Sequence, residues 1–163
     1  MKLYLVQHGD ALPKDMDPKR GLSDKGREDV TQIAELLSRG GVEISTIYHS
    51  GKKRAEDTAR LLRGCLAAGG VLAQRDGIAP LDPVDRVATE AKRWDEDVML
   101  VSHLPFMGKL VSQLVAGDED IPVVAFQPGS VICLERGESG NWIIAWMIRP
   151  ELLRGLALIS NLK

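Results

Sequence analysis

The chain has 163 residues, of which 44% are hydrophobic and 27% charged, and its formal net charge at pH 7 is −2. This composition is ordinary for a soluble globular protein, and the length predicts a single domain over residues 1–163. The slightly negative charge, the low aromatic content and a short apolar run at the amino terminus argue against nucleic-acid binding, a signal peptide and a membrane span, so we expect a cytoplasmic protein.

The first half of the chain alternates predicted strands and helices. Residues 2–7 are a short apolar run typical of a buried strand, which stops at His8 and Gly9. Ser23 is a suitable cap for a helix that ends near residue 39, where two glycines follow. Residues 44–49 are a second predicted strand. The helix after it has one buried side, made of Ala55, Thr58, Ala59, Leu62 and Leu66.

The second half continues this alternation and then changes. It predicts a strand near residues 71–74, a helix over about 84–94, a buried strand over 97–102 and a helix after His103. Residues 130–135 and 142–148 indicate a β-hairpin, and a weakly specified helical segment starts at Pro150. The pattern favours an α/β three-layer sandwich: a mostly parallel central sheet, helices on both faces and a C-terminal antiparallel hairpin. Cys65 and Cys133 are expected to be reduced, largely buried thiols.

Three of the predicted strands end in residues suited to an anion. They lead into His8-Gly9, into Ser50-Gly51 with Arg54 one turn into the next helix, and into Ser102-His103. Ligands of such sheets bind beyond the carboxyl ends of the strands. An arginine matches phosphate oxygens, a helix start offers free N–H groups, and a neutral imidazole is a competent nucleophile. Gly9 is expected to give a tetrahedral group access beside His8.

A structural explanation exists for each of these residues. A single histidine after a strand is usually a satisfied polar residue or a helix cap, and we keep that interpretation for His49. Lys52 and Lys53 are interpreted as the solvated face of a helix. The convergence of His8, Arg54 and His103 at one edge of the sheet nevertheless favours a phosphoryl site.

Several segments resemble the histidine phosphatase superfamily (phosphoglycerate mutase-like), and within it the SixA-type phosphohistidine phosphatase branch. The likeness covers nearly the whole chain, and together the motifs are highly specific. They are Leu-Val-Gln-His-Gly-Asp-Ala at residues 5–11, Arg-Gly-Leu-Ser at 20–23 with Gly26, Ser50 with Arg-Ala-Glu-Asp-Thr-Ala at 54–59, Val-Ser-His-Leu-Pro at 101–105, and Trp142 with Trp146.

The resemblance implies an activity and a set of roles. His8 would attack phosphorus and carry the phosphoryl group, Arg54 and His103 would stabilise its oxygens, and water would hydrolyse the phosphohistidine intermediate. The other phosphate-binding candidates are Gln7, Gly9, Ser50, Ser102 and Arg20. No metal or other cofactor is expected. The expected partners are inorganic phosphate and a phosphorylated protein, such as a phosphotransfer domain.

The chain departs from the family pattern at Gln7, where that pattern has an arginine. Glutamine donates hydrogen bonds but has neither the charge nor the rigid fork of a guanidinium, which predicts weakened activity. Arg20 or Lys14, on the following loop, is positioned in sequence to restore part of the charge. Both are also reasonable as solvated loop residues; that interpretation is preferred for Lys14, and for Arg20 the two are equally reasonable. A serine replaces the usual glycine before His103, a change expected to cost little.

The sequence offers no clear general acid. Asp82 lies in the right region but precedes a proline, which is typical of a turn, and Glu56 and Asp10 are nearer the site in sequence. Imidazole is a better leaving group than an alkoxide, so the absence favours P–N substrates. Two alternatives stay open: a non-catalytic phosphate- or phosphoprotein-binding module, and a small-molecule phosphomonoesterase of the same fold. A nucleotide-binding domain lacks support because no glycine-rich loop precedes Gly51 and Lys52.

Overall fold

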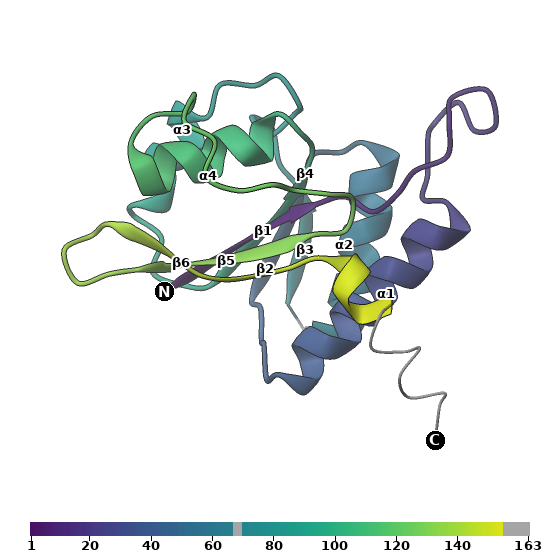
Figure 1. The fold of residues 1–163 in the computed structure, drawn as a ribbon, viewed down its shortest axis with the longest axis horizontal. Helices are drawn as coiled ribbons and strands as arrows, with labels where there is room; N and C mark the ends of the chain where they lie inside the picture. Colours follow the sequence, from purple (N-terminus) through teal and green to yellow (C-terminus); the bar gives the residue numbers. More distant parts are fainter. Residues whose placement is uncertain (67–69, 155–163) are drawn as a thin grey trace.

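A computed structural model describes residues 1–66 and 70–154 of the chain (Figure 1). The helices and strands in order are β1 (Lys2–Gln7), α1 (Asp24–Arg39), β2 (Thr46–His49), α2 (Lys53–Leu66), β3 (Val71–Gln74), α3 (Asp85–Ala91), β4 (Val98–Ser102), α4 (Phe106–Ala116), β5 (Val131–Arg136) and β6 (Trp142–Ile148). Residues 150–154 are also helical, as expected, and the rest of that predicted segment lies outside the described residues.

One mixed sheet organises these elements. Its strand order is β3-β2-β4-β1-β5-β6, in which β3, β2, β4 and β1 are parallel. The hairpin of β5 and β6 adds the antiparallel part, because β5 pairs with β1 in the opposite direction. The predicted α/β fold, with a mostly parallel sheet and a C-terminal hairpin, is confirmed.

Alternation along β1 divides the core into two layers. Leu3 and Leu5 face one side, where they pack with residues of α3 and α4, including the fully buried Phe106. Tyr4 and Val6 face the other side, toward α1 and α2. Figure 1 shows these helix pairs on opposite faces of the sheet. Strands buried on both faces must be apolar at every position, which explains the uninterrupted run in β4.

Most predicted bounds agree with the structure. β1, β3 and β6 have the predicted ends, and Ser23 caps α1 by accepting a hydrogen bond from the Gly26 amide. Helix α3 is shorter than expected, at seven residues. The expectation that both thiols are buried is wrong for Cys65, which is exposed because it lies off the buried side of α2; Cys133 is buried in β5.

Within residues 1–66 and 70–154, no helix has both the length and the apolar composition needed to cross a lipid bilayer.

Candidate active site

Three adjacent strands bring the predicted residues together. β1 and β4 are neighbours in the sheet, with Gln7 paired to Ser102, so His8 and His103 leave the sheet side by side. Their ring centroids are 4.8 Å apart. β2 lies on the other side of β4 and leads through Ser50 to Arg54 at the start of α2. The Arg54 Nε atom is 3.1 Å from His8 Nε2.

The protonation state of His8 follows from its two ring contacts. Its Nδ1 lies 2.7 Å from the Gly9 carbonyl oxygen, which can only accept, so Nδ1 carries the proton. Nε2 is therefore unprotonated, and its lone pair accepts the hydrogen bond from Arg54. Burial, together with the nearby guanidinium groups of Arg54 and Arg20, lowers the pKa of His8 to about 4. At neutral pH the ring is uncharged.

His103 is also held neutral. It is almost fully buried, and burial, His8, Arg54 and Lys52 lower its pKa to about 3. A hydrogen bond of 2.6 Å joins its Nε2 to the Ser50 hydroxyl. Its Nδ1 is buried without a hydrogen-bond partner. Ser50 thus belongs to the site by contact with His103.

Gln7 and Arg20 both lie near these histidines, Gln7 at the end of β1 and Arg20 on the loop after it. Gln7 is buried at the end of β1, and its Oε1 atom has no hydrogen-bond partner. Arg20 is half-buried, adopts a left-handed backbone conformation with φ of 54°, and donates from Nε to the Leu12 carbonyl at 3.1 Å. Its charge lowers the pKa of both His8 and Arg54, so its guanidinium lies within electrostatic reach of the site. Lys14, by contrast, is exposed on the same loop.

Two predicted phosphate-binding residues have other contacts. The Gly9 amide donates to the Thr58 hydroxyl at 3.0 Å, and a Cβ at Gly9 would lie 2.8 Å from Val30 Cγ2. A glycine is therefore needed here for packing against α1. The Ser102 hydroxyl is fully buried and donates to the Ile78 carbonyl, which directs it away from the two histidines.

Thr58 and Asp57 hold the site together, and neither was among the predicted site residues. The Thr58 hydroxyl accepts from Gly9 and donates to the Arg54 carbonyl at 2.8 Å, so it joins the end of β1 to α2. Asp57 is a buried carboxylate that forms an ion pair with Lys53 and accepts from the Leu22 amide at 3.4 Å. A polar residue within an otherwise apolar buried stripe was the available signal for Thr58.

The candidate acids are all engaged elsewhere. Asp82 accepts from the Ala79 amide at 2.7 Å, as its turn sequence predicts. Glu56 accepts from Arg60 at 2.7 Å, and this hydrogen bond lowers its pKa. Asp10 accepts from the Ser23 hydroxyl at 2.6 Å.

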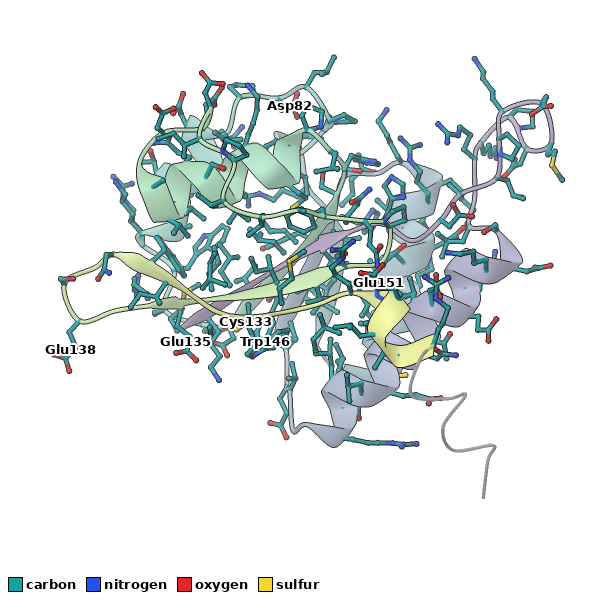
Figure 2. The ribbon with its side chains drawn as sticks, in the orientation of Figure 1. Asp82, Cys133, Glu135, Glu138, Trp146 and Glu151 are labelled. Atoms are coloured by element: carbon teal, nitrogen blue, oxygen red, sulfur yellow. The ribbon has the colours of Figure 1, made fainter. Side chains whose placement is uncertain are left out.

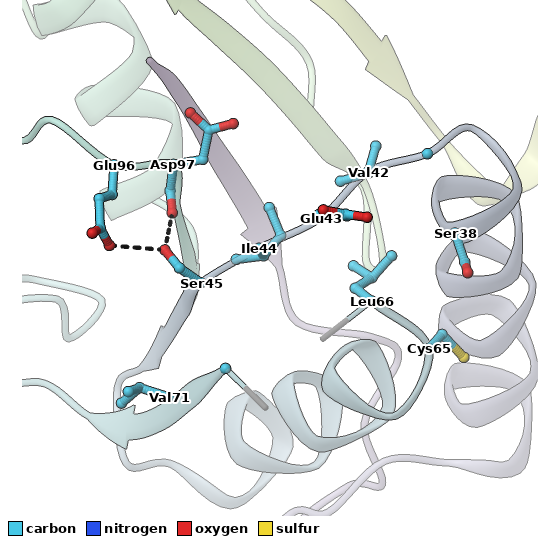
Figure 3. A pocket seen from close by; sticks show the side chains of 12 residues that line it. Ser38, Val42, Glu43, Ile44, Ser45, Cys65, Leu66, Val71, Glu96 and Asp97 are labelled. Carbon is cyan, nitrogen blue, oxygen red and sulfur yellow. Dashed lines mark hydrogen bonds between the residues drawn. The ribbon is translucent and has the colours of Figure 1, made fainter. Parts of the chain in front are cut away.

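A large pocket lies away from these residues. With a volume of about 860 Å³, it is at the opposite end of the sheet, next to the residues that precede β2 and β4 (Figure 3). Its polar groups include Ser45, which hydrogen-bonds to Glu96 and to the Asp97 carbonyl. None of the predicted site residues lines it. Over the described part of the chain, no three His, Cys, Asp or Glu side chains converge into a metal-binding group.

Known proteins share the sequence and the fold of this chain. No family model matches the chain. The phosphohistidine phosphatase SixA of Escherichia coli (strain K12) is 28% identical over 155 residues, which cover 92% of this chain and 94% of SixA. The structure of the protein histidine phosphatase SixA complexed with tungstate superposes with a TM-score of 0.83 and 27% identity, over 94% of this chain and 99% of that one. The chain is therefore a homologue of SixA.

A more distant structure shares the fold of this SixA homologue. Phosphoserine phosphatase from Entamoeba histolytica, in complex with 3-phosphoglyceric acid, superposes with a TM-score of 0.70 at 13% identity, over 91% of this chain and 96% of that one. The resemblance drawn from the motifs is confirmed.

Proposed function

We propose that the chain is a metal-independent phosphohistidine phosphatase that removes the phosphoryl group from a phosphohistidine protein through a phospho-His8 intermediate. The observation that supports this most directly is the unprotonated Nε2 atom of His8, in a ring that burial keeps neutral and that the Gly9 carbonyl fixes in orientation. Homology to SixA supports the reaction class. We further propose that residues 1–163 work as a single cytoplasmic domain.

The reaction has two steps. In the first, His8 Nε2 gives its lone pair to phosphorus as the bond from phosphorus to the substrate imidazole breaks, and that imidazole takes a proton from solvent. Arg54 must exchange its contact with Nε2 for a phosphoryl oxygen, where its charge is closer to the developing negative charge. In the second, water attacks phosphorus, the bond to Nε2 breaks, and phosphate and neutral His8 are released.

Arg20 supplies the second guanidinium in this proposal. Gln7 occupies the position of the family's arginine, so Arg54 lacks its charged neighbour. The tether from Arg20 to the Leu12 carbonyl keeps its side chain beside His8 and Arg54. His103 and Ser50 complete the set of groups around the phosphoryl oxygens.

The engaged carboxylates favour a P–N substrate over an alkyl ester. An alkoxide leaving group needs a proton from a positioned acid, whereas imidazole leaves readily. Asp82, Glu56 and Asp10 each have another partner. We therefore expect phosphohistidine to be hydrolysed faster than an alkyl phosphate ester, and the reverse order would contradict the assignment.

The deciding experiment is to trap the intermediate. A phosphohistidine protein carrying ³²P is mixed with the enzyme, quenched in alkali and digested, and the labelled peptide is identified. We expect label on His8 in the wild type and none in His8→Ala, with phosphate released only by the wild type. Label on another residue, or phosphate release by His8→Ala, would overturn the mechanism.

A phosphate-binding module without catalysis is the second candidate, and Gln7 is the observation that favours it. In that case, the wild type would bind tungstate or phosphate but neither form the labelled intermediate nor release phosphate. The same trapping experiment therefore separates the two functions.

A further inference from the structure

A groove lies along α4. It has a volume of about 580 Å³ and lies between the loop at residues 80–85 and the segment from Pro105 to Glu119. Pro105 is two residues from His103, and the bond from Ser102 to the Ile78 carbonyl fixes the start of the loop to the end of β4. Figure 2 shows Asp82 on this loop, on the same side of the sheet as α4. One end of the groove is therefore next to the site.

Exposed apolar side chains lie on the groove or directly beside it. Leu81 lines the groove and is 86% exposed, and Leu104, directly after His103, is 42% exposed. Three prolines also line the groove: Pro80 and Pro83 on the loop, and Pro105 at the start of α4. An isolated exposed leucine needs no explanation, but an apolar group beside a reactive centre is typical of a surface that a partner covers.

The charges of the groove are opposite to those of the site. Four carboxylates line it, from Asp82, Asp85, Asp118 and Glu119, against one cation, Lys109. Lys109 is already paired with Glu119 at 2.7 Å. At the site, the charges that act on the two histidines include those of Arg20, Lys52 and Arg54. A ligand that spans both regions has to be anionic at one end and basic along the other.

We propose that this groove binds the segment of the protein substrate that flanks its phosphohistidine, and that the segment is basic and carries an apolar side chain that packs on Leu81. The inference rests on the proposed phosphohistidine phosphatase function. It follows from the position of Pro105, which lines the groove two residues after His103, and from the complementary charge. It gives a reason for the enzyme to distinguish among phosphohistidine proteins.

Matched peptides test the proposal. Twelve-residue peptides with one phosphohistidine, made with phosphoramidate, carry either three lysines and a leucine or three glutamates and a leucine on one flank. One pair has the flank before the histidine and a second pair has it after. The measurement is kcat/KM for phosphate release, with free phosphohistidine as the substrate that cannot reach the groove.

We expect the wild type to prefer the lysine peptide in at least one pair, and added salt to weaken the preference. Asp85→Lys should reduce kcat/KM for that peptide about three-fold, as is usual for one exposed charge pair, and Leu81→Ser on the order of five-fold, as loss of a packed leucine predicts. Neither should change turnover of free phosphohistidine. Asp95→Lys and Ile143→Ser are the matched controls, because both residues are exposed and away from the groove.

The outcomes separate this inference from the function on which it rests. If the wild type hydrolyses free phosphohistidine but shows no preference in either pair, or if the groove variants behave like the controls, the docking surface is wrong while the activity stands. If free phosphohistidine and all four peptides are left intact, the proposed function itself fails.

Discussion

Gln7 is the residue whose substitution we expect to raise the rate. Its side chain ends the central strand β1, where it is buried and its Oε1 atom lacks a partner. An arginine there would add a charge-assisted hydrogen bond to the transferring phosphoryl group, worth about 1.5–3 kcal/mol. We therefore expect the site to hydrolyse phosphohistidine more slowly than it would with an arginine at position 7.

We predict that Gln7→Arg raises kcat for phosphohistidine hydrolysis by about 10- to 150-fold if the full hydrogen-bond energy acts on the transition state. The lower end is expected because Arg20 already supplies part of the charge. Single-turnover phosphate release measures the effect. Gln7→Met, of similar size without polar groups, should be slower than the wild type. An unchanged or lower rate in correctly folded Gln7→Arg would show that Arg20 fully replaces the missing group.

At the scale of elements, Thr58 joins β1 to α2. Thr58→Val would leave the Gly9 amide buried without a partner, at a cost of about 1–3 kcal/mol in the free energy of unfolding. The rate should fall as well, because Gly9 orients the His8 ring. Urea unfolding and kcat check both effects. Thr58→Ser keeps the hydroxyl and should retain most of the activity. A loss in Thr58→Ser as large as that in Thr58→Val would contradict this role of the hydroxyl, because serine keeps it.

Two helical glycines should respond in opposite ways to alanine. A Cβ at Gly26 in α1 would lie 2.1 Å from the Asp10 carbonyl oxygen, so it would push away the loop that carries Arg20. Gly64 in α2 has no atom within 4 Å of the added carbon. Gly26→Ala should destabilise the protein by about 1–3 kcal/mol and reduce activity. Gly64→Ala should raise stability by up to about 1 kcal/mol without affecting the rate. Thermal unfolding compares them, and a neutral result at Gly26 would show that the loop adapts freely.

For the whole molecule, the sequence predicted the sheet and the gathering of His8, Arg54 and His103 because both depend on local patterns. Apolar runs identify the strands, and the rule that ligands bind at carboxyl ends then locates the site. The direction of individual polar groups was not predictable in this way. Ser102 faces Ile78, and Gly9 is required by its contact with Val30, because these choices depend on tertiary neighbours. The exposure of Cys65 likewise depends on which side of α2 is covered.

The three histidines give the whole molecule a common response to acid. Burial lowers the pKa of His8 to about 4 and that of His103 to about 3, and it also lowers the pKa of His49. Unfolded histidines have a pKa of about 6.5, so below that pH the unfolded chain binds protons that the native state excludes. The stability that the neutral rings contribute is therefore complete above about pH 6.5 and decreases as the pH falls toward 4 and 3.

This linkage predicts that the free energy of unfolding decreases steadily from pH 7 to pH 4, while kcat/KM of the folded enzyme stays flat until the pH approaches the pKa of His8. Urea titrations at several pH values measure the first, and initial rates the second. His8→Gln should remove the part of the pH dependence of the unfolding free energy that comes from His8. The part that comes from the carboxylates should remain, because the substitution does not change them. If the unfolding free energy of the wild type and of His8→Gln had the same slope against pH, His8 would be protonated equally easily in the folded and the unfolded chain. A neutral His8 nucleophile could then no longer be assumed below pH 6.5.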